Sequence, residues 1–466
     1  MENDYTSVMS RRSEILLKAT GIDYARVSRG RLAFDYDNLM ANIGYDLHRI
    51  AEIQRQTGVG NTPLLELRNV TELVRRRALP GKGARIFVKD EAANPSGSFK
   101  DRRAALSAYH AKLKGYPGLV AATSGNYGAA VAAQSAAYGL KAIVVQEVFD
   151  SAGRGQPEIL EKGRKCEALG AEVLQTTVGP ELFYMLLRVL EETGYFNASL
   201  YTPFSIAGIE TLGFEIAQQT REATGRFPDA VLATHAGGGM VTGTARGLRA
   251  AGAADTEIIG VSVDLQGLHM ASDKDFNRKS FTTGHTGFSV PFTTWPDRVD
   301  VPRNAARPLR YLDRFLLVSQ GQVFYATELL ARLEGLERGP AGNTSLAAAL
   351  VLARTMDRDR VLVVTETEYT GAGKVPNSQL AFARSMGVDV RYGGEEDSPG
   401  NVICIPSSFD ALQTRDVDLA TLKTSFIRKA VGELRGLLDG EAEFISCDSR
   451  SELADVMDAA NTWSPD

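Results

Sequence analysis

The feature of this sequence that most constrains its fold is a long alternation of short apolar segments with helical ones. Residues 84–91 (ARIFVKDE), 118–123 (GLVAAT) and 141–147 (KAIVVQE) are rich in β-branched and small apolar residues and predict strands. Residues 229–235 and 360–366 continue the pattern, with helical stretches between the strands. Strands joined through helices predict an α/β fold with parallel sheets, and ligands of such folds bind beyond the carboxyl ends of the strands.

The bulk properties exclude several classes of function. Apolar residues make up 44% of the 466 residues and the net charge is −5, which is ordinary for a globular protein and gives no reason to expect nucleic acid or an acidic membrane as a partner. No long uncharged apolar run predicts a membrane span, and the first residues lack the pattern of a signal peptide. The three cysteines form no metal-binding motif, and their low number predicts a reducing, cytoplasmic location.

A single lysine ends the tight loop at residues 93–103 (ANPSGSFKDRR). Small and turn-forming residues precede Lys100, and an alanine-rich helical stretch follows it. Most lysines are solvated surface residues, but a lysine held at the mouth of a helix also suits covalent chemistry.

A second loop, residues 123–133 (TSGNYGAAVAA), lies between a predicted strand and a predicted helix. Free backbone N–H groups at the start of that helix would suit an anion such as a substrate carboxylate. Taken alone, the simpler interpretation is a Ser or Asn N-cap with glycines for the turn.

A third loop, residues 235–247 (HAGGGMVTGTARG), has three consecutive glycines between a strand and a helix. Its backbone amides could wrap a phosphate. A dinucleotide fingerprint is disfavoured because Thr242 stands where its third glycine should be, although Asp264 ends the following strand as a ribose-binding acid would. An amine, a carboxylate site and a phosphate site together suit a Schiff-base cofactor with a phosphate arm that acts on an amino acid.

These motifs resemble those of the fold-type II pyridoxal-phosphate enzymes, the group of threonine synthase, cysteine synthase and the tryptophan synthase β chain. The quoted stretches are GNTPLLEL, NPSGSFKDR, TSGNYG and AGGGMVTG. The resemblance implies two α/β domains with parallel or mixed sheets and pyridoxal 5′-phosphate between them. The expected organisation is a helical N-terminal extension (1–58), a catalytic core (59–400) and a C-terminal segment (401–466).

The resemblance also implies roles for individual residues. Lys100 would hold the cofactor as a Schiff base and act as the catalytic base, and Asn126 would hydrogen-bond the ring oxygen of the cofactor. The substrate carboxylate would be received by Thr123, Ser124, Gly125, Asn126 and Tyr127. The phosphate would be contacted by Gly237, Gly238, Gly239 and Met240, with Thr242 retained from the threonines of the family motif.

The partner of the pyridine nitrogen stays open. The family places a Ser or Thr there, just after a late strand, and residues 361–374 (VLVVTETEYTGAGK) offer three threonines. The TGAGK motif favours Thr370, the offset from the strand favours Thr367, and Thr365 is the third. Glu366 or Glu368 in this role would make the ring a stronger electron sink.

Stretches outside these motifs resemble the family of 2-amino-4-oxopentanoate thiolase β subunits, among them residues 11–24, 191–213 and 335–349. This resemblance implies that CoA cleaves 2-amino-4-oxopentanoate to acetyl-CoA and D-alanine, or the reverse condensation. It also implies a small α subunit as partner and self-association. The alternatives are a threonine synthase-like replacement or elimination, a related carbon–carbon bond-forming step, and a non-catalytic scaffold, which the intact loops disfavour.

Residues 264–311 form a long irregular insertion, which predicts a second substrate site or a subunit contact. Arginines suit the phosphates of CoA. The insertion could close over CoA with His269, His285, Arg298, Arg303 and Arg307.

Overall fold

The computed structural model describes residues 4–123, 125–179, 181–266, 273, 275–282, 297–369, 375–394, 397–438 and 440–462. Ser124, Thr370, His269 and His285 therefore lie outside the described residues, as do residues 267–272, 274 and 283–296 of the predicted insertion.

The larger sheet has seven strands in the order β1-β2-β10-β7-β8-β9-β13. The five inner strands, β2, β10, β7, β8 and β9, are mutually parallel, whereas β1 and β13 close the two edges in antiparallel pairs. Their bounds are Leu64–Glu66 (β1), Arg85–Asp90 (β2), Val361–Glu366 (β10), Ala230–Thr234 (β7), Glu257–Val263 (β8), Arg314–Val318 (β9) and Arg415–Asp416 (β13). All six residues of β10 are buried, as expected for a central strand with helices on both faces.

The smaller sheet has four parallel strands in the order β5-β4-β3-β6, and β11 pairs with β12 in a separate parallel pair. The bounds are Glu172–Thr177 (β5), Lys141–Phe149 (β4), Gly118–Thr123 (β3), Phe196–Asn197 (β6), Asp389–Tyr392 (β11) and Val402–Ile405 (β12). The α/β fold class predicted from the sequence is confirmed.

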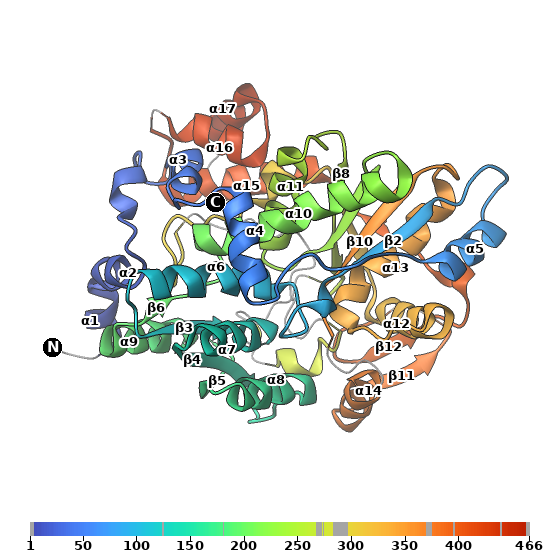
Figure 1. Ribbon diagram of the computed structural model, residues 1–466. Helices are drawn as coiled ribbons and strands as arrows, with labels where there is room; N and C mark the ends of the chain where they lie inside the picture. Colours follow the sequence, from blue (N-terminus) through green and yellow to red (C-terminus); the bar gives the residue numbers. More distant parts are fainter. Residues whose placement is uncertain are drawn as a thin grey trace.

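The helices of the sheet-bearing part cover both faces of each sheet (Figure 1). They are Arg68–Arg77 (α5), Lys100–Leu113 (α6), Asn126–Tyr138 (α7), Pro157–Ala168 (α8), Glu181–Thr193 (α9), Pro203–Thr224 (α10), Gly239–Ala250 (α11), Gln320–Glu334 (α12), Pro340–Thr355 (α13) and Val375–Ser385 (α14). Side-chain alternation decides which face each residue serves. In β3, Leu119 and Ala121 join the core under α6 and α7, while Val120 joins the core under α9.

Helices also open and close the chain: Tyr5–Ser10 (α1), Arg12–Thr20 (α2), Tyr36–Ala41 (α3) and Leu47–Gln56 (α4), then Leu419–Leu434 (α15), Glu441–Ser449 (α16) and Leu453–Thr462 (α17). The C-terminal helices bury their own cluster, which includes Phe426 and Ile445 and takes in Leu32 from the N-terminal part. The domain limits at residues 58 and 400 stay predictions. Among the described helices, none is long and apolar enough to cross a membrane.

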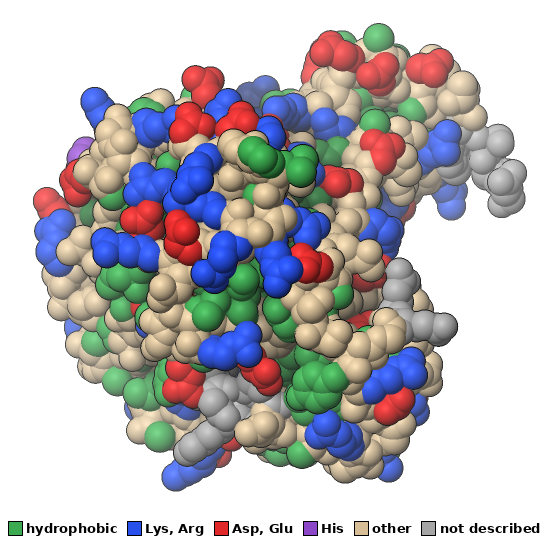
Figure 2. Space-filling view, turned by 90° about the vertical axis from the view of Figure 1, so that its right-hand side faces the viewer, with side chains coloured by type: hydrophobic (Ala, Val, Ile, Leu, Met, Phe, Trp, Pro, Cys, Tyr) green, Lys and Arg blue, Asp and Glu red, His purple; other side chains and the backbone are tan. Residues whose placement is uncertain are grey.

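The face of the molecule in Figure 2 carries basic side chains beside acidic ones, with apolar side chains between them. Exposed ion pairs join Arg77 to Asp410 at 3.0 Å and Lys82 to Asp357 at 2.7 Å. The charge mixture on this face agrees with the modest net charge of the sequence.

Candidate active site

The lysine loop follows β2 and makes Lys100 the first residue of α6. Asp101 holds the loop, because its carboxylate accepts the backbone N–H of Ser96 at 2.7 Å and the side-chain amide of Gln134 at 3.2 Å. Burial raises the pKa of Asp101 to about 6, and these hydrogen bonds oppose the rise. Gly97 takes a positive φ of 79° at the turn, which favours glycine.

Backbone hydrogen bonds tie this loop to the segment that follows β10. The N–H of Phe99 donates to the carbonyl of Thr367 at 3.0 Å, and the N–H of Tyr369 donates to the carbonyl of Gly97 at 2.7 Å. Two loops that are far apart in the sequence are thereby held side by side, and Glu368 is brought close to Lys100.

Lys100 lies in surroundings that favour its neutral amine. Burial and the cations of Arg103 and Lys162 together lower its pKa to about 7, whereas the carboxylate of Glu368 acts in the opposite direction. Its ammonium group lies 4.7 Å from the centre of the Phe99 ring. A lysine with this pKa offers a free amine at neutral pH, as imine formation and proton abstraction require.

A buried ion cluster lies beside Lys100. The Lys162 ammonium is 3.6 Å from a carboxylate oxygen of Glu368 and also pairs with Glu158. Burial raises the pKa of Glu368, with Lys162 opposing. Lys162 and Glu158 were not predicted from the sequence, because an acidic and a basic residue four positions apart on a helix usually form a surface pair.

The asparagine loop connects β3 to α7, with Thr123 as the last strand residue and Asn126 as the first helical one. The Thr123 hydroxyl accepts the backbone N–H of Gly125 at 3.0 Å. Tyr127 is buried and its hydroxyl lies 3.2 Å from that of Ser205 on α10, so it ties the start of α7 to that helix. The first N–H groups of α7 have no helical acceptor, which leaves them for an anion.

The glycine loop connects β7 to α11, and each of its three glycines meets a neighbour that would exclude a side chain. A Cβ atom on Gly237 would lie 1.5 Å from the Tyr201 hydroxyl, and one on Gly239 would lie 2.5 Å from Nη2 of Arg103. Gly238 has a φ of 81° and closely approaches Pro308. The result is a cradle at the start of α11, where backbone amides and the helix dipole suit a phosphate.

Two other residues predicted at the phosphate, Met240 and Thr242, are buried in α11. Met240 belongs to the apolar core between α11 and the larger sheet. The hydroxyl of Thr242 accepts the backbone N–H of Arg307 at 3.2 Å. These side chains therefore fix the helix against its surroundings, while contacts of their backbone amides with phosphate stay a prediction.

The residues that are candidates for the partner of the pyridine nitrogen differ in their surroundings. The Thr365 hydroxyl donates to the carbonyl of Leu232 at 3.2 Å inside the sheet, and Thr367 is 6% exposed after the strand end. Glu366 is fully buried, and a Cβ atom on Gly342 would lie 1.8 Å from its carboxylate. Burial, reinforced by Glu368, raises the pKa of Glu366 well above its ordinary value, which favours its neutral form.

The described arginines of the insertion have partners within the chain. Arg298 pairs with Asp300 at 3.0 Å, and Arg307 is buried against Asp448 at 2.9 Å. Arg303 donates to the hydroxyl of Ser28 at 2.9 Å. Their predicted contact with CoA stays a prediction.

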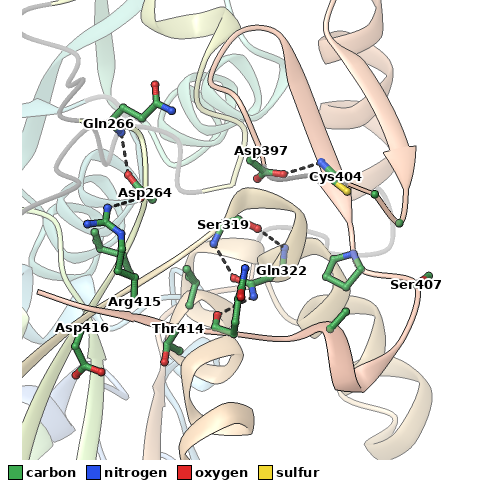
Figure 3. A pocket seen from close by; sticks show the side chains of 17 residues that line it. Asp264, Gln266, Ser319, Gln322, Asp397, Cys404, Ser407, Thr414, Arg415 and Asp416 are labelled. Atoms are coloured by element: carbon green, nitrogen blue, oxygen red, sulfur yellow. Dashed lines mark hydrogen bonds and ion pairs between the residues drawn. The ribbon is translucent and has the colours of Figure 1, made fainter.

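A separate open cleft of about 590 Å³ lies past the ends of β8 and β9 (Figure 3). Its lining includes Asp264, Asp397 and Asp416, and Arg415 pairs with Asp264. Among the described residues, those that line this cleft do not belong to the three loops. The excess of carboxylates makes this cleft unsuited to the phosphates of CoA.

The three loops fit pyridoxal phosphate on their own chemistry. Lys100 supplies an amine of lowered pKa, the glycine loop supplies a cradle without side chains, and the start of α7 supplies free amides.

Comparison with known proteins points the same way. Residues 55–366 match the model of a family described as "Pyridoxal-phosphate dependent enzyme". Two relatives named "2-amino-4-ketopentanoate thiolase beta subunit" are similar along almost their entire length. One, from an unknown prokaryotic organism, is 59% identical over 97% of this chain and 96% of its own. The other, from Acetoanaerobium sticklandii, is 60% identical over 96% of each chain.

More distant matches share the core. A threonine synthase from a Bacillus species is 25% identical over 62% of this chain and 76% of its own. Among solved structures, cysteine synthase from Entamoeba histolytica has a TM-score of 0.53 at 20% identity and covers 73% of this chain and 91% of its own. An O-ureido-L-serine synthase has a TM-score of 0.54 at 20% identity and covers 72% of this chain and 94% of its own. These structures share the fold.

Proposed function

Because this chain belongs to the family of pyridoxal-phosphate dependent enzymes, we propose that it is the β subunit of a thiolase that acts on 2-amino-4-oxopentanoate. It is an enzyme, and its cofactor is pyridoxal 5′-phosphate. In the proposed reaction, CoA cleaves 2-amino-4-oxopentanoate to acetyl-CoA and D-alanine, or the reverse condensation occurs. The observation that carries the proposal is identity of 59% over 97% of the chain, which extends far beyond the cofactor loops.

The bonds change as follows in the cleavage direction. The CoA thiolate attacks the carbonyl carbon C4, the bond between C3 and C4 breaks, and acetyl-CoA leaves. C3 keeps the electron pair and takes a proton, which makes it the methyl group of alanine. Bound pyridoxal phosphate would supply the electron sink that makes the carbon next to the amino group acidic.

The residues of the chain would bind and move protons around this chemistry. Lys100 would hold the cofactor and then, as a free amine with a pKa of about 7, move a proton at Cα. The loop from Thr123 to Tyr127 would hold the substrate carboxylate, with Asn126 turned toward the cofactor ring, and Gly237 to Gly239 would hold the phosphate. Glu368 and Lys162 would set the charge beside Lys100.

The close relatives are named as beta subunits, so we propose a small α subunit as partner and self-association of the chain. We also propose that a threonine, Thr367 or Thr370, faces the pyridine nitrogen of the cofactor. Binding of CoA by side chains of this chain belongs to the same proposal.

The test is a substrate comparison with the purified chain, alone and with a co-expressed α subunit. D-alanine with acetyl-CoA should give 2-amino-4-oxopentanoate and free CoA, and Lys100→Ala should abolish the reaction. O-phosphohomoserine and O-acetylserine, assayed without CoA, represent the replacement and elimination alternative. Turnover of either, with no reaction of D-alanine, would contradict the thiolase proposal.

A further inference from the structure

Arg103 lies one helical turn after Lys100 and is a buried cation in unusual surroundings. Its side chain is 3% exposed, and among the described residues no carboxylate lies within ion-pair distance of it. Its neighbour Arg102 is also buried but pairs with Glu91 and Glu215, both at 2.7 Å. Burying an uncompensated charge is costly, so an arginine kept in this state calls for an anion that binds there.

One nitrogen of the Arg103 guanidinium has a hydrogen-bond partner in the described part of the chain, and another has none. Nη1 donates to the carbonyl of Leu200 at 2.5 Å, which fixes the side chain. Nε has no hydrogen-bond partner within the described part of the chain. Burial lowers the pKa of Arg103 to about 10, with Tyr201 and Tyr127 opposing, so it stays protonated at neutral pH. A donor-rich cation is therefore positioned with unused hydrogen-bonding capacity.

The side chain of Arg103 extends to the glycine loop. Nη2 of Arg103 approaches Gly239 so closely that a Cβ atom there would lie 2.5 Å away. Gly239 is the first residue of α11, where the backbone amides and the positive end of the helix dipole face outward. The Tyr201 hydroxyl lies against Gly237 in the same loop. The Arg103 guanidinium and the first backbone amides of α11 therefore lie close together.

We propose that Arg103 is a side-chain ligand of the cofactor phosphate, which adds a full positive charge to the amides of the glycine loop. A phosphate monoester is close to a dianion at neutral pH, and a guanidinium beside a helix N-terminus matches that charge. The inference rests on the cofactor assignment within the proposed function and is independent of the reaction that follows. The competing anion is the substrate carboxylate, since Tyr127 of the asparagine loop also lies near Arg103.

The test compares the dissociation constants of pyridoxal phosphate and of pyridoxal, which lacks the phosphate, for the apoenzyme. Absorbance of the lysine-bound cofactor reports both titrations. Arg103→Gln should weaken pyridoxal phosphate by about 10- to 100-fold and change pyridoxal by less than about threefold. The dissociation constant of pyridoxal phosphate for Arg103→Lys should fall between those of the wild type and Arg103→Gln, because the positive charge remains and the fork of donors is lost. ³¹P NMR of inorganic phosphate added to the apoenzyme should show binding by the wild type that Arg103→Gln loses.

A matched control is Arg246→Gln. Arg246 lies on α11 itself but pairs with Glu210 at 2.6 Å, so its loss should leave the ratio of the two dissociation constants unchanged. Thermal unfolding checks that each variant folds, and Arg103→Lys carries the comparison if Arg103→Gln does not fold.

Two results would overturn the inference. One is an equal loss of affinity for both ligands in Arg103→Gln. The other is an unchanged ratio with a higher KM for the amino acid, which would assign Arg103 to the substrate carboxylate. A wild type that binds the cofactor but does not convert D-alanine would refute the proposed reaction and leave the test of Arg103 intact.

Discussion

Phe99 donates its backbone N–H to the carbonyl of Thr367 at 3.0 Å, and this bond holds the loop that carries Lys100 against the end of the central strand β10. Since the bond uses only backbone atoms, the side chains of Lys100 and Glu368 can be changed without removing it. Substitutions at these two positions therefore test charge and proton chemistry rather than loop position.

The capture of pyridoxal phosphate by the apoenzyme should depend on pH through Lys100. Burial lowers its pKa to about 7, and the neutral amine is the reactive form. We expect the rate of capture to rise as the pH increases through 7 and to level off above about pH 8. Stopped-flow absorbance between pH 5.5 and pH 9 measures this. A midpoint near the ordinary lysine value would contradict the prediction.

Glu368→Gln should move that midpoint to lower pH. The Glu368 carboxylate raises the pKa of Lys100, so its removal leaves burial and Arg103 to act with less opposition. At pH 6 the variant should capture the cofactor about threefold faster than the wild type, or more. Glu158→Gln is the matched control, because Glu158 pairs with Lys162 but is not among the charges that shift the pKa of Lys100, so the midpoint should stay near 7. A common shift in both variants would point to a general loss of packing.

Gly237→Ala should weaken cofactor binding by steric exclusion. The new methyl group would lie 1.5 Å from the Tyr201 hydroxyl, so either the loop or the tyrosine must move. Overpacking of this kind costs about 1–3 kcal/mol, which corresponds to a loss of about 5- to 150-fold if the strain falls on the cradle. Equilibrium titration with pyridoxal phosphate gives the value. The double variant Gly237→Ala, Tyr201→Ala should recover part of the affinity, and no recovery would argue against the clash.

Arg102→Met should destabilise the fold without selective loss of the cofactor phosphate. It would leave Glu91 buried without its partner, which typically costs about 3–5 kcal/mol. Urea unfolding of the apoenzyme measures the free energy. Arg68→Met is the control, because Arg68 is exposed and lies 3.9 Å from Glu66, and its loss should cost less than about 1 kcal/mol.

The same network predicts how stability responds to acid. Burial raises the pKa of Glu215, but Arg102, together with Lys89, outweighs burial and holds this pKa at about 2, against an ordinary value of 4.5. A lowered carboxylate pKa contributes stability that is fully present above pH 4.5 and is lost as the pH falls toward 2. Unfolding free energies at pH 6, 4 and 3 should fall in that order. Arg102→Met should flatten the part of this dependence that comes from Glu215, and an unchanged slope would contradict the assignment.

The strands and the three loops were readable from local sequence because their signals are local. β-branched runs predict strands, and three successive glycines before a helix predict a close approach, which Tyr201 and Arg103 now explain. The role proposed for Arg103 was not predictable from the sequence, although the arginine pair stands close to Lys100. Whether an arginine finds a carboxylate depends on residues far along the chain: Arg102 finds Glu215, and Arg103 finds none in the described structure.

The position of Lys162 and the partner of the pyridine nitrogen also depend on contacts between segments far apart in the sequence. Lys162 lies beside Glu368 only because α8 of the smaller sheet meets the segment after β10. The choice between Thr367 and Thr370 depends on side-chain directions past a strand end, which a pattern of residue types does not encode.

The strand order has a consequence for how the protein is made. β10 pairs with β2 on one side and with β7 on the other, yet it is translated after both of them. Until residues 361–366 leave the ribosome, β2 and β7 expose unpaired edges, and the lysine loop lacks the backbone partners on Thr367 and Tyr369 that fix it. A nascent chain stopped before residue 361 would carry Lys100, the asparagine loop and all three glycines and still have no assembled cofactor site. We therefore expect the chain to capture its cofactor only late in synthesis, and the unpaired strand edges to be open to misassembly until then.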